Sequence, residues 1–200
     1  MMKGCDATLF CSVLRYNHPM RKTFQHTILF AIAALVIVAD QLTKAYIRNN
    51  LALFESFAPI PALGDFLTII NTHNTGAAFG MFKQAGGIFT IVAIVVSAAI
   101  VFYYRQIPEG QIPIRIALGL QLGGAIGNLI DRLLYGTVTD FVFFHWYDSL
   151  NAPIFNVADL SITSGVIVLA LLMWHEHNLE RAAKVAAVAL AEPAPSAAHE

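Results

Sequence analysis

The chain has 200 residues, of which 57% are hydrophobic and only 12% are charged. Soluble domains carry about 25% charged residues, so this composition indicates a protein whose surface largely faces lipid. The net charge of -1 provides no basic field, which argues against nucleic acid as a partner. The length allows one compact domain rather than two.

Residues 1–26 are expected to form a cytoplasmic N-terminal tail. Within it Met20 directly precedes two basic residues, and this pattern leads us to expect that translation begins at Met20. The first apolar stretch follows at about 27–46. Basic residues before an apolar run are also typical of a signal peptide. That interpretation is rejected because no small-residue cleavage site follows the run, where Asp40 and Lys44 stand instead.

Three further apolar stretches are long enough to cross a bilayer, which requires roughly 20 residues in an α-helix. They lie at about 86–104, 112–130 and 158–174. Residues 176–200 then form a C-terminal tail that ends in a run rich in Ala, Pro and Glu. Because such a composition cannot form a packed core, the tail is predicted to be disordered.

The basic residues predict the orientation. Eight of the twelve Lys and Arg residues lie in the two tails and in the loop between the second and third spans. Since an excess of basic residues marks the cytoplasmic side, we expect both termini to be cytoplasmic. The two longer segments, at about 47–85 and 131–157, are expected to face the outside.

Polar and ionisable groups near a bilayer are costly, so each of them requires a reason. In this chain they gather in five short segments at or near the predicted outer ends of the spans. The segments are Asp40-Gln41-Leu42-Thr43-Lys44, Asn74-Thr75-Gly76-Ala77-Ala78-Phe79, Gly127-Asn128-Leu129-Ile130-Asp131-Arg132, Val138-Thr139-Asp140-Phe141 and Phe155-Asn156-Val157-Ala158-Asp159.

The third span carries a row of small residues. Gly119, Gly123, Gly127 and Asp131 follow one another at a spacing of four, so they share one helix face. Small residues at this spacing allow another helix to approach closely, which directs Asp131 toward the interior of the bundle. An equally weighted alternative is that Asp131 and Arg132 only satisfy a helix end at the interface.

Two aspartates are ambiguous when taken singly. Asp159 follows Asn156 by three residues, so it fits a capping acid at the start of the fourth helix. Asp140 alone fits an ordinary loop acid. Together they are two carboxylates at the same membrane edge beside apolar residues. Paired carboxylates in a dry site are what water activation by an aspartic peptidase requires.

Other chemistries fit less well. His175 and His177 are two residues apart and lie on the predicted inner side, so no metal site is expected. The glycines of the third span lack the lysine of a phosphate-binding loop. A transporter would place its acids near the midplane, usually with an internal repeat. A scaffold protein would not need paired acids.

The five segments, in this order across four spans, resemble those of the lipoprotein signal peptidases, or signal peptidases II, of bacterial membranes. The resemblance covers about residues 27–175. It implies an all-α membrane protein, with a four-transmembrane-helix bundle, a small extracytoplasmic β-rich cradle and a membrane-surface helix. The cradle is expected within about 50–83, where residues 66–70 are β-prone, and the surface helix within about 142–152.

The resemblance also implies a function. The family removes the signal peptide from prolipoproteins, just before a diacylglyceryl-modified cysteine, without a cofactor. Its catalytic aspartates fall here on Asp140 and Asp159. The Gly-x-Gly-Asp segment of presenilin-like aspartyl proteases is absent. We expect a monomer among the lipids of the bacterial cytoplasmic membrane, with its site toward the outer leaflet. The residues expected to hold the substrate or support the pair are Asp40, Asn74, Asn128, Asp131, Arg132 and Asn156.

Overall fold

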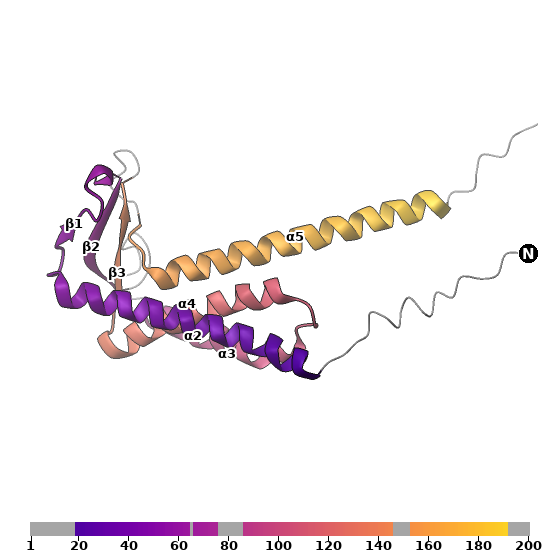
Figure 1. Cartoon of the computed structure of the whole chain (residues 1–200), viewed down its shortest axis with the longest axis horizontal. Helices are drawn as coiled ribbons and strands as arrows, with labels where there is room; N and C mark the ends of the chain where they lie inside the picture. The colour runs from indigo at the N-terminus through magenta and orange to yellow at the C-terminus, as the bar shows by residue number, and fades with distance from the viewer. Residues whose placement is uncertain (1–18, 65, 76–85, 146–152, 192–200) are drawn as a thin grey trace, which may run out of the picture.

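The computed structural model of the chain describes residues 19–64, 66–75, 86–145 and 153–191 (Figure 1). Within these ranges the chain forms four long helices and a small antiparallel sheet. In chain order the elements are α2 (Pro19–Asn50), β1 (Ser56–Phe57), the 3-10 turn η1 (Pro61–Leu63), β2 (Leu67–Asn74), α3 (Gly86–Tyr103), the 3-10 turn η3 (Tyr104–Gln106), α4 (Ile112–Tyr135), β3 (Val138–Phe144) and α5 (Val157–Ala191).

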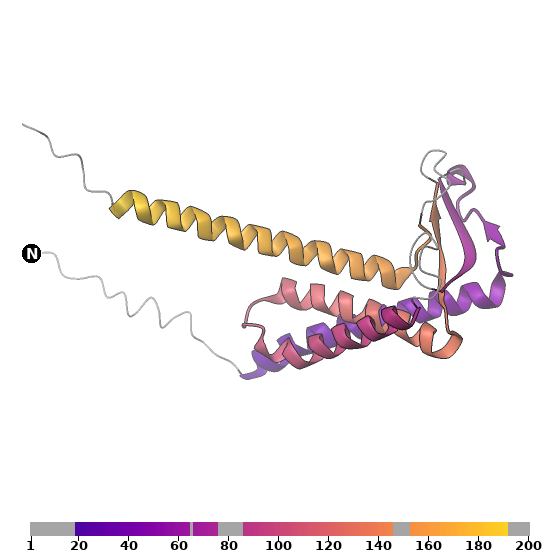
Figure 2. The same ribbon diagram turned by 180° about the vertical axis from the view of Figure 1, so that it is seen from behind.

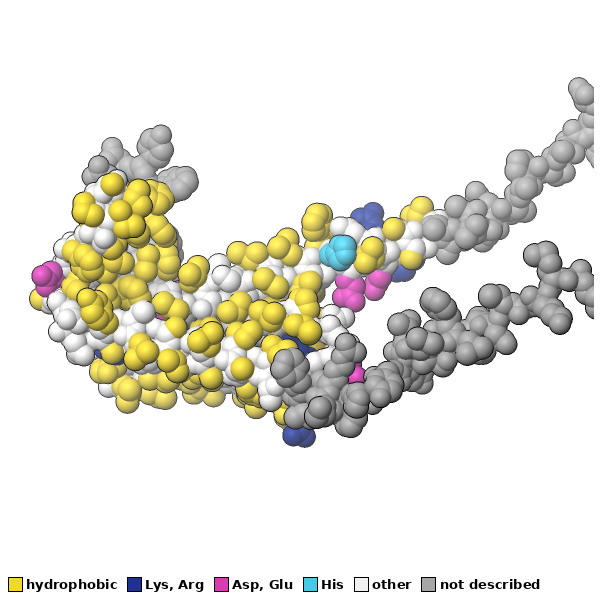
Figure 3. All heavy atoms as spheres, in the orientation of Figure 1, with side chains coloured by type: hydrophobic (Ala, Val, Ile, Leu, Met, Phe, Trp, Pro, Cys, Tyr) yellow, Lys and Arg dark blue, Asp and Glu magenta, His cyan; other side chains and the backbone are white. Residues whose placement is uncertain are grey.

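Each long helix carries a stretch that is long and apolar enough to cross a membrane: Thr27–Asn50, Gly86–Gln106, Ile112–Tyr135 and Val157–Val185. These stretches correspond to the four predicted spans, and each extends further toward its C-terminus. Hydrophobic side chains cover much of the outer surface of the bundle (Figure 3). A surface of this kind suits contact with lipid rather than with water.

Helix α4 packs against α2, α3 and α5. The glycines of α4 permit the close approach of α2: a Cβ built at Gly119 would lie 2.7 Å from the Leu29 carbonyl oxygen. A Cβ at Gly127 would lie 2.6 Å from Oδ2 of Asp40. Asp131, on the same face, is fully buried. The prediction that this row of small residues points Asp131 into the bundle is therefore confirmed.

The sheet has the strand order β1-β2-β3, and it stands at the end of the bundle where α2 ends and α5 begins (Figures 1 and 2). The predicted β-prone segment 66–70 lies largely in β2. Strand β3 pairs with β2 in antiparallel register, with Asp140 opposite Thr72. The sequence interpretation of Asp140 as a loop acid missed β3. Because residues 138–141 are all buried, this strand lacks the alternation that marks a half-exposed one.

Two further expectations differ from the structure. Residues 142–144, expected in the surface helix, belong to β3, while residues 146–152 lie outside the described part of the chain. Helix α5 continues to Ala191, so the predicted disorder is wrong for residues 176–191. These residues are rich in Ala, Leu and charged helix formers, and they extend a helix that the fourth span has already nucleated. The first turn of α2 and the last turn of α5 both lie far from the sheet (Figures 1 and 2).

Candidate active site

A pocket of about 450 Å³ lies where the sheet meets the bundle, and both candidate aspartates line it. Its floor comes from α4, and α3 and α5 supply apolar walls. The lining residues are Asn74, Phe89, Val92, Ala93, Val96, Gln121, Ala125, Asn128, Arg132, Val138, Asp140, Pro153, Ile154, Phe155, Asp159 and Ile162. An apolar cavity with a few convergent polar groups is typical of a binding site for a largely apolar ligand.

Asp140 projects from β3 and is only 2% exposed. Its two carboxylate oxygens each accept a hydrogen bond from an amide: Nδ2 of Asn74 donates at 2.9 Å and Nδ2 of Asn156 at 2.7 Å. Its backbone carbonyl accepts a third bond from the Thr72 hydroxyl at 2.9 Å. Strand pairing and side-chain bonds together fix this carboxylate in one orientation.

The environment of Asp140 disfavours its charged form. Burial, followed by the negative charge of Asp159, raises the pKa of Asp140 to about 7. The amide donors of Asn74 and Asn156 and the charge of Lys44 act in the opposite direction, and they do not cancel the effect of burial. The protonated form of Asp140 is therefore populated at neutral pH.

Asp159 lies in the first turn of α5, where it has two roles. Oδ1 accepts a hydrogen bond from Nδ2 of Asn128 at 2.7 Å. Oδ2 accepts one from the backbone N–H of Asn156 at 3.3 Å, and the backbone N–H of Asp159 donates to Oδ1 of Asn156 at 3.0 Å. This reciprocal pair forms a capping box. The capping interpretation of Asp159 is thus correct for the helix end, and the same carboxylate also lines the pocket.

Asn156 connects the two aspartates. It is fully buried, and its Nδ2 donates to Asp140 while its backbone N–H donates to Asp159. The same Nδ2 lies 3.1 Å from Oδ1 of Asn128. One residue at the start of α5 therefore sets the relative position of the two carboxylates.

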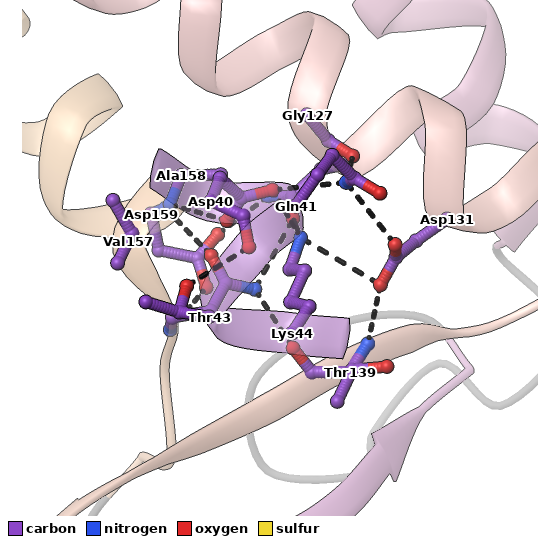
Figure 4. A network of polar contacts seen from close by, with 12 residues as sticks. Asp40, Gln41, Thr43, Lys44, Gly127, Asp131, Thr139, Val157, Ala158 and Asp159 are labelled. Atoms are coloured by element: carbon purple, nitrogen blue, oxygen red, sulfur yellow. Dashed lines mark hydrogen bonds and ion pairs between the residues drawn. The ribbon is translucent and has the colours of Figure 1, made fainter. Parts of the chain in front are cut away.

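Near the pocket, a buried ion pair within α2 also makes hydrogen bonds to α4 and α5 (Figure 4). Nζ of Lys44 lies 2.8 Å from Oδ2 of Asp40 and donates to Oδ1 of Asn128 at 2.8 Å. Oδ1 of Asp40 accepts the backbone N–H of Ala158 at 3.0 Å, next to Asp159. Asp40 therefore supports the first turn of α5, and Lys44 orients the amide that holds Asp159.

Asp131 belongs to the same network and reaches β3 (Figure 4). Its Oδ2 accepts the backbone N–H of Thr139 at 2.9 Å, one residue before Asp140. Lys44 lies 3.6 Å from this carboxylate and Arg48 lies 3.4 Å from it. Arg48 also donates to the Thr139 hydroxyl at 3.0 Å. Asp131 thus anchors the strand that carries Asp140.

Arg132 faces the pocket instead. Its Nη1 donates to the backbone carbonyl of Asn128 at 3.4 Å, and its guanidinium lies 5.9 Å from the centre of the Phe89 ring. Arg132 therefore presents a positive charge to the space beside the two aspartates. The helix-end alternative accounts for the bond from Arg132 to the Asn128 carbonyl, but it does not account for the contacts of Asp131 with Thr139, Lys44 and Arg48.

The structure separates the predicted site residues into two groups. Asn74, Asn128, Arg132, Asp140 and Asp159 line the pocket, whereas Asp40, Asp131 and Asn156 are fully buried and are not part of its lining. Residues 76–79 of the second polar segment lie outside the described part of the chain.

Sequence reasoning assigned no role to Lys44, Arg48 or Thr139. Asp40, Lys44 and Arg48 follow one another at a spacing of four at the end of the first apolar stretch, and that pattern was the available signal. Within the described ranges, no cluster of three or more His, Cys, Asp or Glu residues is arranged to hold a metal ion.

The chain matches the family model described as "Signal peptidase (SPase) II" over residues 32–175. The lipoprotein signal peptidase of Pseudomonas aeruginosa strain UCBPP-PA14 is 40% identical over 156 residues, covering 76% of this chain and 90% of the relative. That of Symbiobacterium thermophilum is 44% identical over 141 residues, covering 70% and 90%.

Two solved structures are also similar. One is described as "Bacterial membrane enzyme structure by the in meso method at 2.3 A resolution"; it is 34% identical, with a TM-score of 0.67, and the match covers 74% of this chain and 88% of that one. The other, a bacterial membrane enzyme at 1.9 Å, is 35% identical with a TM-score of 0.64, covering 72% and 91%. By its sequence and its fold, the chain therefore belongs to the signal peptidase II family.

Proposed function

We propose that this chain is an aspartic endopeptidase that removes the signal peptide from prolipoproteins by cutting just before a diacylglyceryl-modified cysteine. The observation that carries the proposal is that Asp140 and Asp159 line the same pocket and are bridged by Asn156. Two carboxylates in one poorly hydrated site share a proton, which is the arrangement needed to activate water and protonate a leaving group.

In the proposed mechanism, Asp159 is the general base. Two N–H donors and the positive end of α5 stabilise negative charge on this carboxylate. It takes a proton from water as the water oxygen attacks the carbonyl carbon before the lipidated cysteine. The pKa of Asp140, near 7, supports Asp140 as the member that carries the shared proton.

Protonated Asp140 donates a hydrogen bond to the developing oxyanion and then gives its proton to the leaving amine. The carbon–nitrogen bond breaks, and the new carboxyl group leaves with the signal peptide. The pair ends the cycle with the proton that Asp159 took from water, so it again holds one proton. Arg132, whose positive charge faces the pocket, stabilises the oxyanion.

The apolar walls of the pocket suit the proposed substrate. Phe89, Val92, Ala93 and Val96 form a hydrophobic face of α3 opposite the carboxylates. Two acyl chains fix the depth of the substrate cysteine in the bilayer, so the aspartates must lie at that depth. We place the pocket toward the outer leaflet of the bacterial cytoplasmic membrane, with both termini cytoplasmic, and we place the enzyme there as a monomer among membrane lipids.

The test is cleavage of one precursor by purified enzyme in detergent. A synthetic precursor with a diacylglyceryl cysteine should be cut before that cysteine, and the same peptide with a free cysteine should be cut far more slowly. Asp140→Asn and Asp159→Asn should each abolish cleavage while they still bind the lipidated precursor.

The control is Glu180→Gln, because Glu180 is an exposed acid on α5, the helix that carries Asp159. This variant should cleave like the wild type. The double variant of Asp140 and Asp159 should be no worse than either single one, because the pair acts as a unit. Substantial turnover by either single Asn variant would remove the pair from the mechanism.

A further inference from the structure

The pocket contains a buried amide well away from its aspartates. Gln121 lines the pocket from α4, together with Val96 of α3 and Ile162 of α5. Its Nε2 is buried and has no hydrogen-bond partner among the described residues. An amide without a partner in an apolar environment is costly, and in a membrane it is costlier because water cannot substitute. The mechanism above does not use this group.

The place of Gln121 in α4 sets its distance from the reaction. Asn128 of α4 donates a hydrogen bond to Asp159, so its position along α4 serves as the reference for the proposed catalytic pair. Gln121 precedes Asn128 by seven residues, which at the rise of an α-helix is about 10 Å. An extended peptide covers the same distance in about three residues. Gln121 lies on the side of the pair that faces away from the sheet, toward the start of α4.

The stem of Gln121 is held in place by α5. A Cβ built at Gly165 would lie 2.8 Å from Cγ of Gln121, so the two helices are in close contact at this point. The close contact restricts the stem of Gln121, while its terminal amide can still rotate so that Nε2 turns toward the pocket. A donor on a fixed stem is well suited to a single acceptor on a ligand.

A signal peptide offers an acceptor at this depth. Its apolar part crosses the membrane as a helix, and it must become extended to enter a peptidase site. The last four carbonyl groups of any helix have no partner within the helix. In hydrocarbon those carbonyls need a donor from elsewhere.

We propose that Nε2 of Gln121 donates a hydrogen bond to a backbone carbonyl of the signal peptide, three or four residues before the cleaved bond, where the helix of the substrate ends. This inference rests on the proposed function, and it adds a contact that selects substrates by where their helix unwinds. Gln121 is then a specificity-determining residue, and it takes no part in proton transfer.

The experiment measures kcat/KM for a lipidated precursor and for versions in which one backbone amide is replaced by an ester. The replacement weakens the carbonyl as an acceptor. It is made in turn at the second to the sixth residue before the cleaved bond. Wild-type enzyme should lose about threefold to tenfold at the third or fourth residue, the range expected for one hydrogen bond. This arm needs no enzyme variant, so it does not depend on the folding of a mutant.

The second arm uses Gln121→Met, which keeps the unbranched stem beside Gly165 and removes the amide. The variant should be about threefold to tenfold slower and should no longer respond to the ester at that residue. It should also be at least as heat-stable as the wild type, because an unpartnered buried amide is gone. If Gln121 had only a structural role, Gln121→Met would be less heat-stable than the wild type and would respond to the backbone esters as the wild type does.

The matched control is Ser97→Ala. The Ser97 hydroxyl is also buried without a partner within the described ranges, but it is not part of the pocket lining there. This variant should leave kcat/KM unchanged.

Several results would overturn the inference while the proposed function stands. One is equal sensitivity of the wild type and Gln121→Met to every backbone ester, and another is full activity of Gln121→Met. A third is that the difference in activity between the wild type and Gln121→Met disappears only when the two acyl esters of the lipid are replaced by ethers. This third result would assign Gln121 to the lipid. If the wild type does not cleave the lipidated precursor at all, the proposed function itself fails.

Discussion

Replacing Asp140 by Asn is expected to stabilise the protein at alkaline pH while it abolishes cleavage. Burial of the wild-type carboxylate, followed by the negative charge of Asp159, disfavours its charged form and raises the pKa of Asp140 from 3.8 to about 7. A carboxyl whose pKa is higher in the folded state binds an extra proton on folding between about pH 4 and pH 7. The stability of the wild type therefore falls as pH rises through this window, and the penalty is complete above it.

The magnitude follows from the two pKa values. A difference of about three pH units at 1.36 kcal/mol each gives a penalty of roughly 4 kcal/mol at pH 8. The Asn variant has no such penalty. However, it has one acceptor oxygen for the two amide donors of Asn74 and Asn156, and the lost bond costs about 1–3 kcal/mol. The net gain in stability is about 1–3 kcal/mol at pH 8 and close to zero at pH 5.

The assay is thermal unfolding of the purified protein in detergent at pH 5 and at pH 8, with Glu180→Gln as the exposed control. The Tm of Asp140→Asn, relative to the wild type, should rise between pH 5 and pH 8, and that of Glu180→Gln should not. If Asp140→Asn lowers the Tm equally at both values, burial of charge at Asp140 is not the cause of its raised pKa, and the reasoning is refuted.

Two further predictions concern the same site, and a third concerns the orientation of the chain in the membrane. Cleavage should fall as pH rises through about 7, since the proposed acid Asp140 loses its proton there; a rate of cleavage that keeps rising to pH 9 would contradict that role. Asp131→Asn should lower the free energy of unfolding by about 1–3 kcal/mol, because Lys44 and Arg48 lose a carboxylate partner while Lys44 keeps its ion pair with Asp40. The variant should reduce cleavage without abolishing it. A fully stable and fully inactive Asp131→Asn protein would instead place this residue among the catalytic groups. Cysteines introduced at the exposed positions Glu55, beside the sheet, and Gln106, at the other end of the bundle, should differ in labelling by an impermeant reagent in spheroplasts. Labelling at Gln106 alone would invert the proposed topology.

The sequence alone was sufficient for the features that depend on local composition. Four long apolar stretches predicted four helices, because a chain in lipid must satisfy its backbone groups within each helix. The spacing of Gly119, Gly123 and Gly127 predicted which face of the third span is buried, since helix periodicity is a local property. The residues around Asp140 and Asp159, together with the family resemblance, predicted these two aspartates as the candidate pair.

The tertiary structure decided how these aspartates are held and in which state. The bond from the backbone of Ala158 to Asp40 joins residues 118 positions apart, and no local pattern predicts such a pairing. Strand β3 depends on pairing with β2, so its residues alone did not identify it. The raised pKa of Asp140 comes from burial and from the charge of Asp159, and both exist only after the sheet and α5 meet. Hydrophobicity and helical periodicity are written along the chain, whereas desolvation and charge proximity arise only between segments that folding brings together.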